Sequence, residues 1–212
     1  MEPLVMMELA ETKRIYAAIA HIFQDSTRTC LVVTSAARAE GKTTTVAGLG
    51  AIAARQSGKR VLAIDLNWFS PALHGYFGLE PVFNQKSLDN EESITKVVQA
   101  SGIENLDILT APQPRMRNNG SSKDSSSLGM EIVRMARQAY DIVLVDTSSV
   151  FPTNRYMIDP VSLSGEADGT LLVVLASVTP RQAVKRAHTR LQASGAKVIG
   201  AVVNQWKNKV LC

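Results

Sequence analysis

The chain has 212 residues, 45% of them hydrophobic, which is enough for one well-buried domain and short for two. Its formal net charge of +4 is modest and its Lys and Arg residues are scattered, so the composition does not favour a nucleic-acid partner. No stretch approaches the ~18 apolar residues of a membrane span, and the N-terminus lacks the basic and apolar order of a signal peptide. We therefore expect a single cytoplasmic domain over residues 1–212.

Apolar runs alternate with helical patterns along the chain, which is typical of parallel strands joined by crossover helices. Strands are expected at CLVV, VLAI, DILT, DIVLV, TLLVVLA and KVIGAVV. Helices are expected at 7–23, 43–56, 93–100, 128–139 and 180–193. Because the strands are hydrophobic throughout, both faces of the sheet should be covered. The predicted fold is a doubly wound α/β domain with a mostly parallel sheet, whose ligand belongs at the carboxyl ends of the strands.

One connecting segment stands apart by composition. Residues 112–127 read PQPRMRNNGSSKDSSS and contain almost no apolar side chains. Such a segment cannot bury enough apolar area to offset the entropy lost on ordering. We expect a mobile loop there.

The segment AARAEGKTT directly follows the first expected strand and opens an Ala-rich helix. This context indicates a phosphate-binding loop of the GxxxxGK[ST] type, in which backbone N–H groups and a helix N-terminus converge on phosphate oxygens. Gly41, Lys42 and Thr43 hold its diagnostic end, where the lysine neutralises phosphate charge and the hydroxyl reaches Mg²⁺. Alanines at 36 and 39 make the loop less permissive to left-handed backbone than a glycine-rich one.

Two further expected strands end in a carboxylate. YDIVLVDTSS ends its apolar run at Asp146, and RVLAIDLN ends its run at Asp65. An acid at the end of a buried parallel strand is suited to hold the Mg²⁺ shell of a bound nucleotide. The two carboxylates should therefore face one phosphate site.

The order of these segments resembles the bacterial tyrosine kinases of capsule and exopolysaccharide synthesis, which belong to the MinD/ParA-like branch of P-loop ATPases. The matching segments are TSAxxxEGKTT, VLAIDLNxxxPxLHxxFGL, YDIVLVDTSS, ADGTLLVV and GAKVIGAVVN, and they extend over residues 11–204. MinD and ParA themselves carry a signature lysine where this chain has Ala37. That difference favours the kinase branch.

The resemblance implies ATP and Mg²⁺ as cofactors and a role for each matched residue. Lys42 would contact the β and γ phosphates, Asp65 would orient or deprotonate the attacking group, and Asn204 would contact adenine. The candidate nucleotide-binding residues are Ala39, Glu40, Gly41, Lys42, Thr43, Thr44 and Asn204, the candidate catalytic residues are Lys42, Asp65 and Asp146, and the candidate metal ligands are Thr43, Asp65 and Asp146.

The chain departs from the family pattern in two respects. Where the family has a DxDxR motif, Asp65 matches the first acid, but Asn67 stands at the second and Phe69 at the arginine. The family also ends in a tyrosine-rich tail, whereas this sequence has only QWKNKVLC after Asn204. Because phosphoryl transfer depends mainly on positioning and charge neutralisation, losing an acid threatens turnover more than nucleotide affinity. The acceptor tyrosine then lies on another protein, or phosphotransfer has been lost.

By resemblance, the expected function is that of a cytoplasmic ATPase or tyrosine kinase domain that regulates capsular or exopolysaccharide synthesis and export. The implied partners are a membrane-embedded polysaccharide co-polymerase or activator, which would recruit the domain to the inner face of the membrane, and further copies of the chain in a dimer or ring. Two alternatives remain open: a ParA/MinD-type localisation switch driven by ATP, and a nucleotide-binding scaffold without turnover.

Three weaker features of the sequence can each be interpreted either functionally or structurally. The expected helix RQAVKRAHTRLQ carries several Lys and Arg residues, which form either a basic face for DNA or an acidic partner or, as is more common, a solvated helix face. Glu11 and Arg14 match two of the three members of the family's ExxRxxR subunit-contact pattern, but a Glu and Arg three apart also form an ordinary intrahelical pair. Trp68 and Phe69 are either buried or held by a partner, and the sequence does not separate these possibilities.

Overall fold

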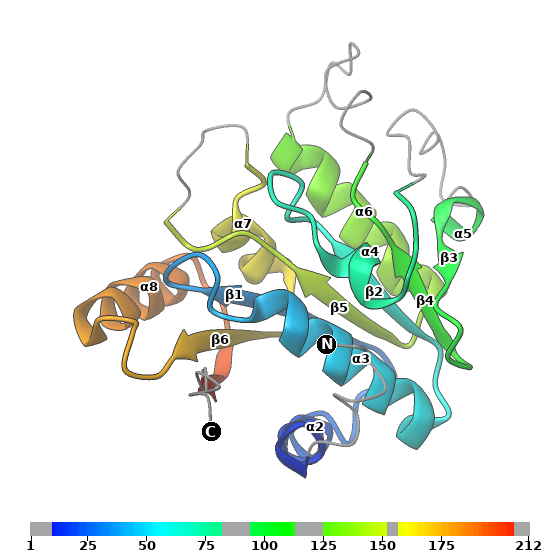
Figure 1. Cartoon of the computed structure of the whole chain (residues 1–212), viewed down its shortest axis with the longest axis horizontal. Coiled ribbons are helices and arrows are strands. Elements are labelled where there is room, and N and C mark those ends of the chain that lie inside the picture. The colour runs from blue at the N-terminus through cyan, green and yellow to red at the C-terminus, as the bar shows by residue number, and fades with distance from the viewer. Residues whose placement is uncertain (1–9, 82–93, 113–124, 152–156, 206–212) are drawn as a thin grey trace, which may run out of the picture.

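A computed structural model describes the protein at residues 10–81, 94–112, 125–151 and 157–205. Its core is a seven-stranded sheet with the order β3-β4-β2-β5-β1-β6-β7 (Figure 1). All neighbouring strands are parallel except β3 and β4. The strands are β1 Thr29–Ser35, β2 Val61–Asp65, β3 Gln99–Ala100, β4 Leu106–Leu109, β5 Ile142–Asp146, β6 Gly169–Leu175 and β7 Val198–Asn204.

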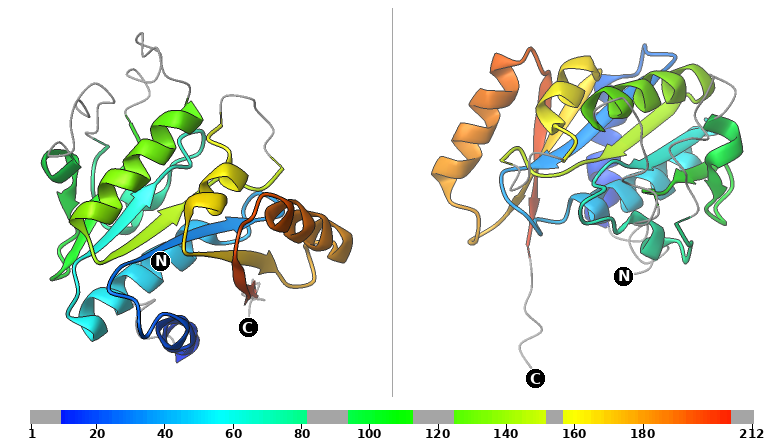
Figure 2. Two further views of the ribbon diagram at one scale, coloured as in Figure 1. Left: turned by 180° about the vertical axis from the view of Figure 1, so that it is seen from behind. Right: turned by 90° about the horizontal axis from the view of Figure 1, so that it is seen from above.

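Helices cover both faces of this sheet. Figure 2 shows α2, α3 and α4 on one face and α6, α7 and α8 on the other. The helices are α2 Ala10–Ile22, α3 Lys42–Ser57, α4 Leu73–Tyr76, α5 Ile94–Val97, α6 Ser125–Ala139, α7 Pro160–Glu166 and α8 Arg181–Ala193. Within the described ranges, none of them has both the length and the apolar character needed to cross a bilayer.

Strand β1 shows why the strand sequences lack alternation. Successive side chains of a strand point to opposite faces, and all seven residues of β1 are buried. Val32 packs on the α6 side of the sheet, whereas Leu31 and Val33 pack on the side of α3. Each large apolar side chain buried in this way contributes about 1.5–3 kcal/mol. A central strand covered on both faces must therefore be hydrophobic throughout.

The structure confirms the predicted fold class and all six predicted strands. It corrects the predicted helix 93–100, which is the short helix α5 followed by the antiparallel strand β3. Helices α4 and α7 were not predicted, since each spans only one or two turns. Helix α6 begins at Ser125, so residues 125–127 belong to it and not to the predicted loop 112–127. Residues 113–124 of that loop, and residues 7–9 of the predicted N-terminal helix, lie outside the described residues.

Candidate active site

The loop between β1 and α3 lies where the parallel strands end (Figure 1). Its backbone takes the left-handed conformation at two positions, with φ of 59° at Ala39 and 97° at Gly41. A Cβ added to Gly41 would lie 2.3 Å from Nδ2 of Asn204, so glycine is needed there both for its φ angle and for the close approach. The left-handed Ala39 costs about 1–2 kcal/mol relative to glycine. Of the two alanines that make the loop less permissive, Ala39 is the one that adopts the left-handed conformation.

Lys42 begins α3 and its side chain lies within the loop. It is only 7% exposed, and its Nζ donates a hydrogen bond of 3.0 Å to Oγ of Ser35, the last residue of β1. Burial lowers the pKa of Lys42, and the nearby carboxylates of Asp146 and Glu40 partly offset this effect. A buried ammonium group with a single neutral hydrogen-bond acceptor is poorly compensated, and it would gain from an anion in the loop.

Glu40 fixes the loop from within. Its carboxylate is buried and accepts hydrogen bonds from the backbone N–H of Ala37, at 2.9 Å, and from the hydroxyl of Thr179 after β6. Asn204, at the end of β7, donates from Nδ2 to the carbonyl oxygen of Glu40 at 3.2 Å. Glu40 and Asn204 therefore connect the loop to the ends of two other strands. In this state the amide group of Asn204 bonds to the protein itself.

Thr43 and Asp146 lie in direct contact. The Thr43 hydroxyl donates a hydrogen bond of 2.6 Å to Oδ2 of Asp146. The other oxygen, Oδ1, is buried and has no hydrogen-bond partner among the described residues. Burial, followed by the charge of Asp65, raises the pKa of Asp146 to about 8. An uncompensated buried carboxylate oxygen beside a threonine hydroxyl is a donor set that Mg²⁺ and its water shell prefer.

Asp65 ends β2 in register with Asp146 on β5, as the sequence predicts. It is fully buried, and three backbone N–H groups donate to its two oxygens at 3.0–3.1 Å, those of Asn67, Ala72 and Leu73. Burial raises the pKa of Asp65, while these three donors act in the opposite direction. Asp65 therefore anchors the connection from β2 to α4 and also lies beside the candidate metal ligand.

The residues that depart from the family pattern separate in space. The Asn67 side chain donates from Nδ2 to the carbonyl oxygen of Ser70 at 3.0 Å, and so it closes the turn after β2. Trp68 is buried in the core on the α6 side. Phe69 is 51% exposed. The sequence did not separate burial from contact with a partner for Trp68 and Phe69; the structure shows burial for Trp68, whereas Phe69 is exposed on this chain.

Two residues at this site had no role assigned from sequence. Ser35 supplies the hydrogen-bond acceptor for Lys42, and its place just before the loop was a local signal that could have revealed it. Tyr76 of α4 forms a hydrogen bond between its hydroxyl and that of Thr44 in the first turn of α3. No local pattern links Tyr76 to Thr44, since the contact depends on how α4 packs against α3.

Other sequence candidates are not drawn together. Among the described residues, no group of three or more His, Cys, Asp or Glu side chains could hold a metal ion. Of the four tyrosines, Tyr16 lies on α2 and Tyr140 hydrogen-bonds Asp107 far from the loop, while Tyr156 is outside the described residues. Tyr76 alone among the described tyrosines contacts the phosphate loop.

Comparison with known proteins agrees with this geometry. The CobQ/CobB/MinD/ParA nucleotide binding domain family matches residues 31–211. Tyrosine-protein kinase YwqD of Bacillus subtilis is 35% identical over 176 residues, which cover 82% of this chain and 71% of the relative. The solved VpsO kinase domain superposes with a TM-score of 0.76 at 22% identity, covering 97% of this chain and 96% of that one.

A second solved structure is more distant in sequence. The septum site-determining protein MinD of Pyrococcus horikoshii, complexed with Mg-ADP, has a TM-score of 0.68 at 18% identity and covers 86% of this chain and 72% of its own. Such low identities show the fold alone, whereas the family match and the YwqD relative also show ancestry. The chain therefore belongs to the CobQ/CobB/MinD/ParA nucleotide-binding family and, within it, to the bacterial tyrosine-protein kinases.

Proposed function

We propose that this protein is an ATP- and Mg²⁺-dependent phosphotransferase domain of the tyrosine-kinase type. The observation that carries the proposal is the contact between Thr43 and Asp146, with one carboxylate oxygen left without a partner in a buried position. A buried charge that the protein leaves uncompensated is costly unless a ligand completes it. Lys42, which is also buried at the start of α3, places an ammonium group near Asp146.

The phosphate loop would bind the nucleotide through its backbone and Lys42. The backbone N–H groups from Ala39 to Thr44 belong to the end of the loop and the first turn of α3, which begins at Lys42. A helix N-terminus favours an anion. Lys42 would exchange its contact with Ser35 for the β and γ phosphates, which supply the charge that the hydroxyl lacks. Asn204 would release the carbonyl oxygen of Glu40 to meet adenine.

Thr43 and Asp146 would hold Mg²⁺, since the hydroxyl and the unpartnered Oδ1 are the oxygen ligands that this ion requires. When bound, Mg²⁺ neutralises charge on the phosphate oxygens during transfer. Asp65 would orient the attacking hydroxyl or water. Its three backbone donors hold its carboxylate in a fixed position on the strand next to that of Asp146. We therefore assign Asp65 a role in positioning rather than in proton transfer.

The partners we propose follow from the family. We infer that the domain acts with a membrane-embedded polysaccharide co-polymerase, which would bring it to the inner face of the membrane, and that it assembles with further copies of itself. Glu11 and Arg14 lie on the exposed surface of α2, where a neighbouring copy could reach them. The acceptor tyrosine is then one on the partner or a neighbouring subunit.

Incubation with ATP labelled on the γ phosphate, in the presence of membranes that contain the co-polymerase, tests the proposal. We expect label on protein tyrosine, lost in the Asp146→Asn variant. Free phosphate without labelled tyrosine would instead support the ATP-driven switch. Binding of ATP without transfer or hydrolysis would support a scaffold, and either result would overturn the phosphotransferase assignment.

A further inference from the structure

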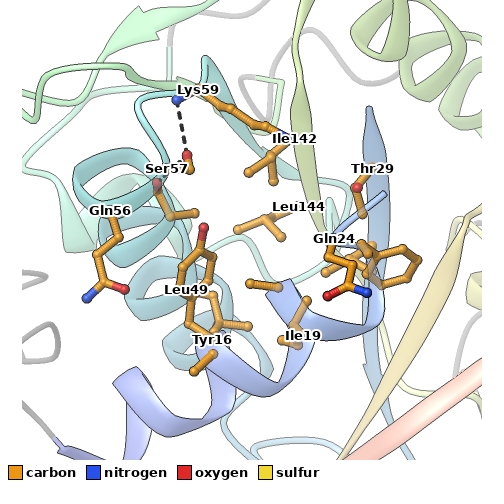
Figure 3. Close-up of a pocket in the computed structure, with 15 residues that line it drawn as sticks. Tyr16, Ile19, Gln24, Thr29, Leu49, Gln56, Ser57, Lys59, Ile142 and Leu144 are labelled. Carbon is orange, nitrogen blue, oxygen red and sulfur yellow. Dashed lines mark hydrogen bonds between the residues drawn. The ribbon is translucent and has the colours of Figure 1, made fainter. Parts of the chain in front are cut away.

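A cavity of about 520 Å³ opens between α2, α3 and the sheet, at the opposite end of α3 from the phosphate loop (Figure 3). We call it the α2 pocket. Its volume falls within the ~300–1,000 Å³ that small-molecule sites occupy. The apolar residues that form most of its wall are Tyr16, Ile19, Leu31, Leu49, Ala53 and Leu144.

The inner part of the α2 pocket is preformed. Leu31 and Leu144 belong to central strands, Leu49 and Ala53 to α3, and all four are buried in the core next to the sheet. Figure 3 shows Tyr16 and Ile19 pointing from α2 toward Leu144 across the opening. Strands and a long helix therefore fix the position of this wall.

The hydroxyls of Tyr16 and Thr29 lie inside the pocket, and the other polar side chains that line it stand at its rim. Ser57 is already satisfied, since its hydroxyl donates to the carbonyl oxygen of Ala53 at 2.7 Å and accepts from the backbone N–H of Lys59 at 3.1 Å. Gln24 and Gln56 stand on opposite sides of the opening (Figure 3). Within the described part of the chain, neither carboxamide has a hydrogen-bond partner. These two side chains therefore offer free donors and acceptors to a ligand.

The charge around the α2 pocket decides the class of ligand. No Asp or Glu lines it, and among the described lining residues Lys59 is the one cation. The Nζ of Lys59 donates to the carbonyl oxygen of Ser26 at 3.3 Å. Helices α2 and α3 also both end beside the pocket, at Ile22 and Ser57, and helix carboxyl ends carry partial negative charge that offsets the ammonium. The pocket thus favours neither an anion nor a cation.

We propose that the α2 pocket binds an uncharged, mostly apolar small molecule, whose hydroxyl or amide group hydrogen-bonds Gln24 or Gln56. The site is separate from the phosphate loop, because no residue of the loop lines the pocket and the first lining residue on α3, Leu49, lies roughly 10 Å beyond Lys42 at 1.5 Å per residue. The same helix therefore begins at the nucleotide site and ends at this second site.

The test uses the whole chain and a pair of fluorescent probes that share one apolar body. Phenylnaphthylamine is uncharged, and anilinonaphthalene sulfonate adds a single negative group to it. We expect one saturable site for phenylnaphthylamine, at least tenfold weaker binding of the sulfonate, and no displacement of the neutral probe by ATP with Mg²⁺. Equal binding of both probes, displacement by ATP, or absence of saturable binding would overturn the proposal.

Matched variants on α2 locate the binding. Ala20 is exposed and lines the pocket, whereas Ala18 is exposed on the same helix and does not. Ala20→Trp should fill the opening and weaken phenylnaphthylamine binding at least tenfold, while Ala18→Trp leaves it unchanged. Circular dichroism confirms folding, and Ala17→Trp at a second exposed lining position repeats the test should Ala20→Trp unfold. Equal effects of Ala18→Trp and the lining variants would contradict the location.

Discussion

The two ends of α3 lie next to very different side chains, ionisable at its beginning and mostly apolar at its end. At its beginning, the ionisable groups of Lys42 and Asp146 are buried, and each has fewer hydrogen bonds than its chemistry can use. At its end, the α2 pocket is lined by Leu and Ala with satisfied or exposed polar groups at the rim. Both ends could take a ligand. The first end would gain from charged groups that pair with Lys42 and Asp146, and the second would gain from an apolar group that fills the pocket.

This difference in lining determines which kind of ligand each end of α3 can bind. Desolvated charges gain most from a charged ligand, because electrostatic interactions are strong in a low-dielectric site. An apolar cavity gains from any uncharged body that fills it, and it discriminates by shape and one or two hydrogen bonds. Substitutions at the first end should therefore change nucleotide chemistry, and those at the second should not.

The largest effect is expected for Lys42→Met. Turnover of ATP should fall by about 10²–10³-fold, because a charge-assisted contact to the phosphates is removed in a buried site. Folding should persist, since the fold gains little from a buried lysine with one neutral acceptor. Steady-state phosphate release measures the turnover, and circular dichroism measures the folding. Lys185→Met on the exposed face of α8 is the control, and turnover in Lys42→Met that matches this control would remove the loop from the mechanism.

The next largest effect is expected for Gly41→Ala. The new Cβ would have to avoid Asn204 and tolerate a φ of 97°, so we expect about 2–4 kcal/mol of destabilisation and weaker nucleotide binding. Urea unfolding checks the stability. Gly75→Ala is the matched control, since a Cβ there has nothing within 4 Å. Wild-type stability for Gly41→Ala would show that the loop backbone is not held as described.

The raised pKa of Asp146 implies that the stability of the nucleotide-free protein depends on pH. Its folded pKa is raised to about 8, so the folded state holds a proton that the unfolded state loses above about pH 4. Stability should therefore decrease as pH rises from about 4 to about 8. Asp146→Asn should remove part of this slope and stabilise the protein at pH 8 by about 1–3 kcal/mol, as measured by unfolding at several pH values. An unchanged slope would mean that Asp146 ionises freely in the folded state.

Tyr76→Phe should have the smallest effect. Loss of the hydrogen bond to Thr44 should cost about 0.5–1.5 kcal/mol without nucleotide, and less with ATP and Mg²⁺, because the Thr44 hydroxyl can then turn to phosphate. Tyr140→Phe loses a comparable bond to Asp107 away from the loop, and its cost should be the same in both conditions. Thermal unfolding with and without ATP distinguishes the two. Identical behaviour of both variants would place Tyr76 outside the nucleotide response.

The parts of the candidate site that could be picked out from the sequence are those marked by local patterns. Lys42 and Thr43 lie within one loop motif, and Asp65 and Asp146 each end a hydrophobic run, so strand register alone brings the two acids together. The contact of Thr179 with Glu40 joins residues 139 positions apart, and no local pattern marks it. The α2 pocket was not predicted for the same reason: its wall depends on how α2 packs against α3, and no local sequence pattern marks the residues that line it.

The central claim is that Thr43 and Asp146 hold Mg²⁺ with the nucleotide. The most direct measurement is the affinity for ATP by calorimetry, with Mg²⁺ and with a chelator, in the wild type, Asp146→Asn and Asp141→Asn. Asp141 and Asp146 are carboxylates at opposite ends of β5, which makes the first a matched control. Mg²⁺ should strengthen ATP binding at least tenfold in the wild type and in Asp141→Asn, and by less than threefold in Asp146→Asn. Equal strengthening by Mg²⁺ in all three proteins would contradict the account.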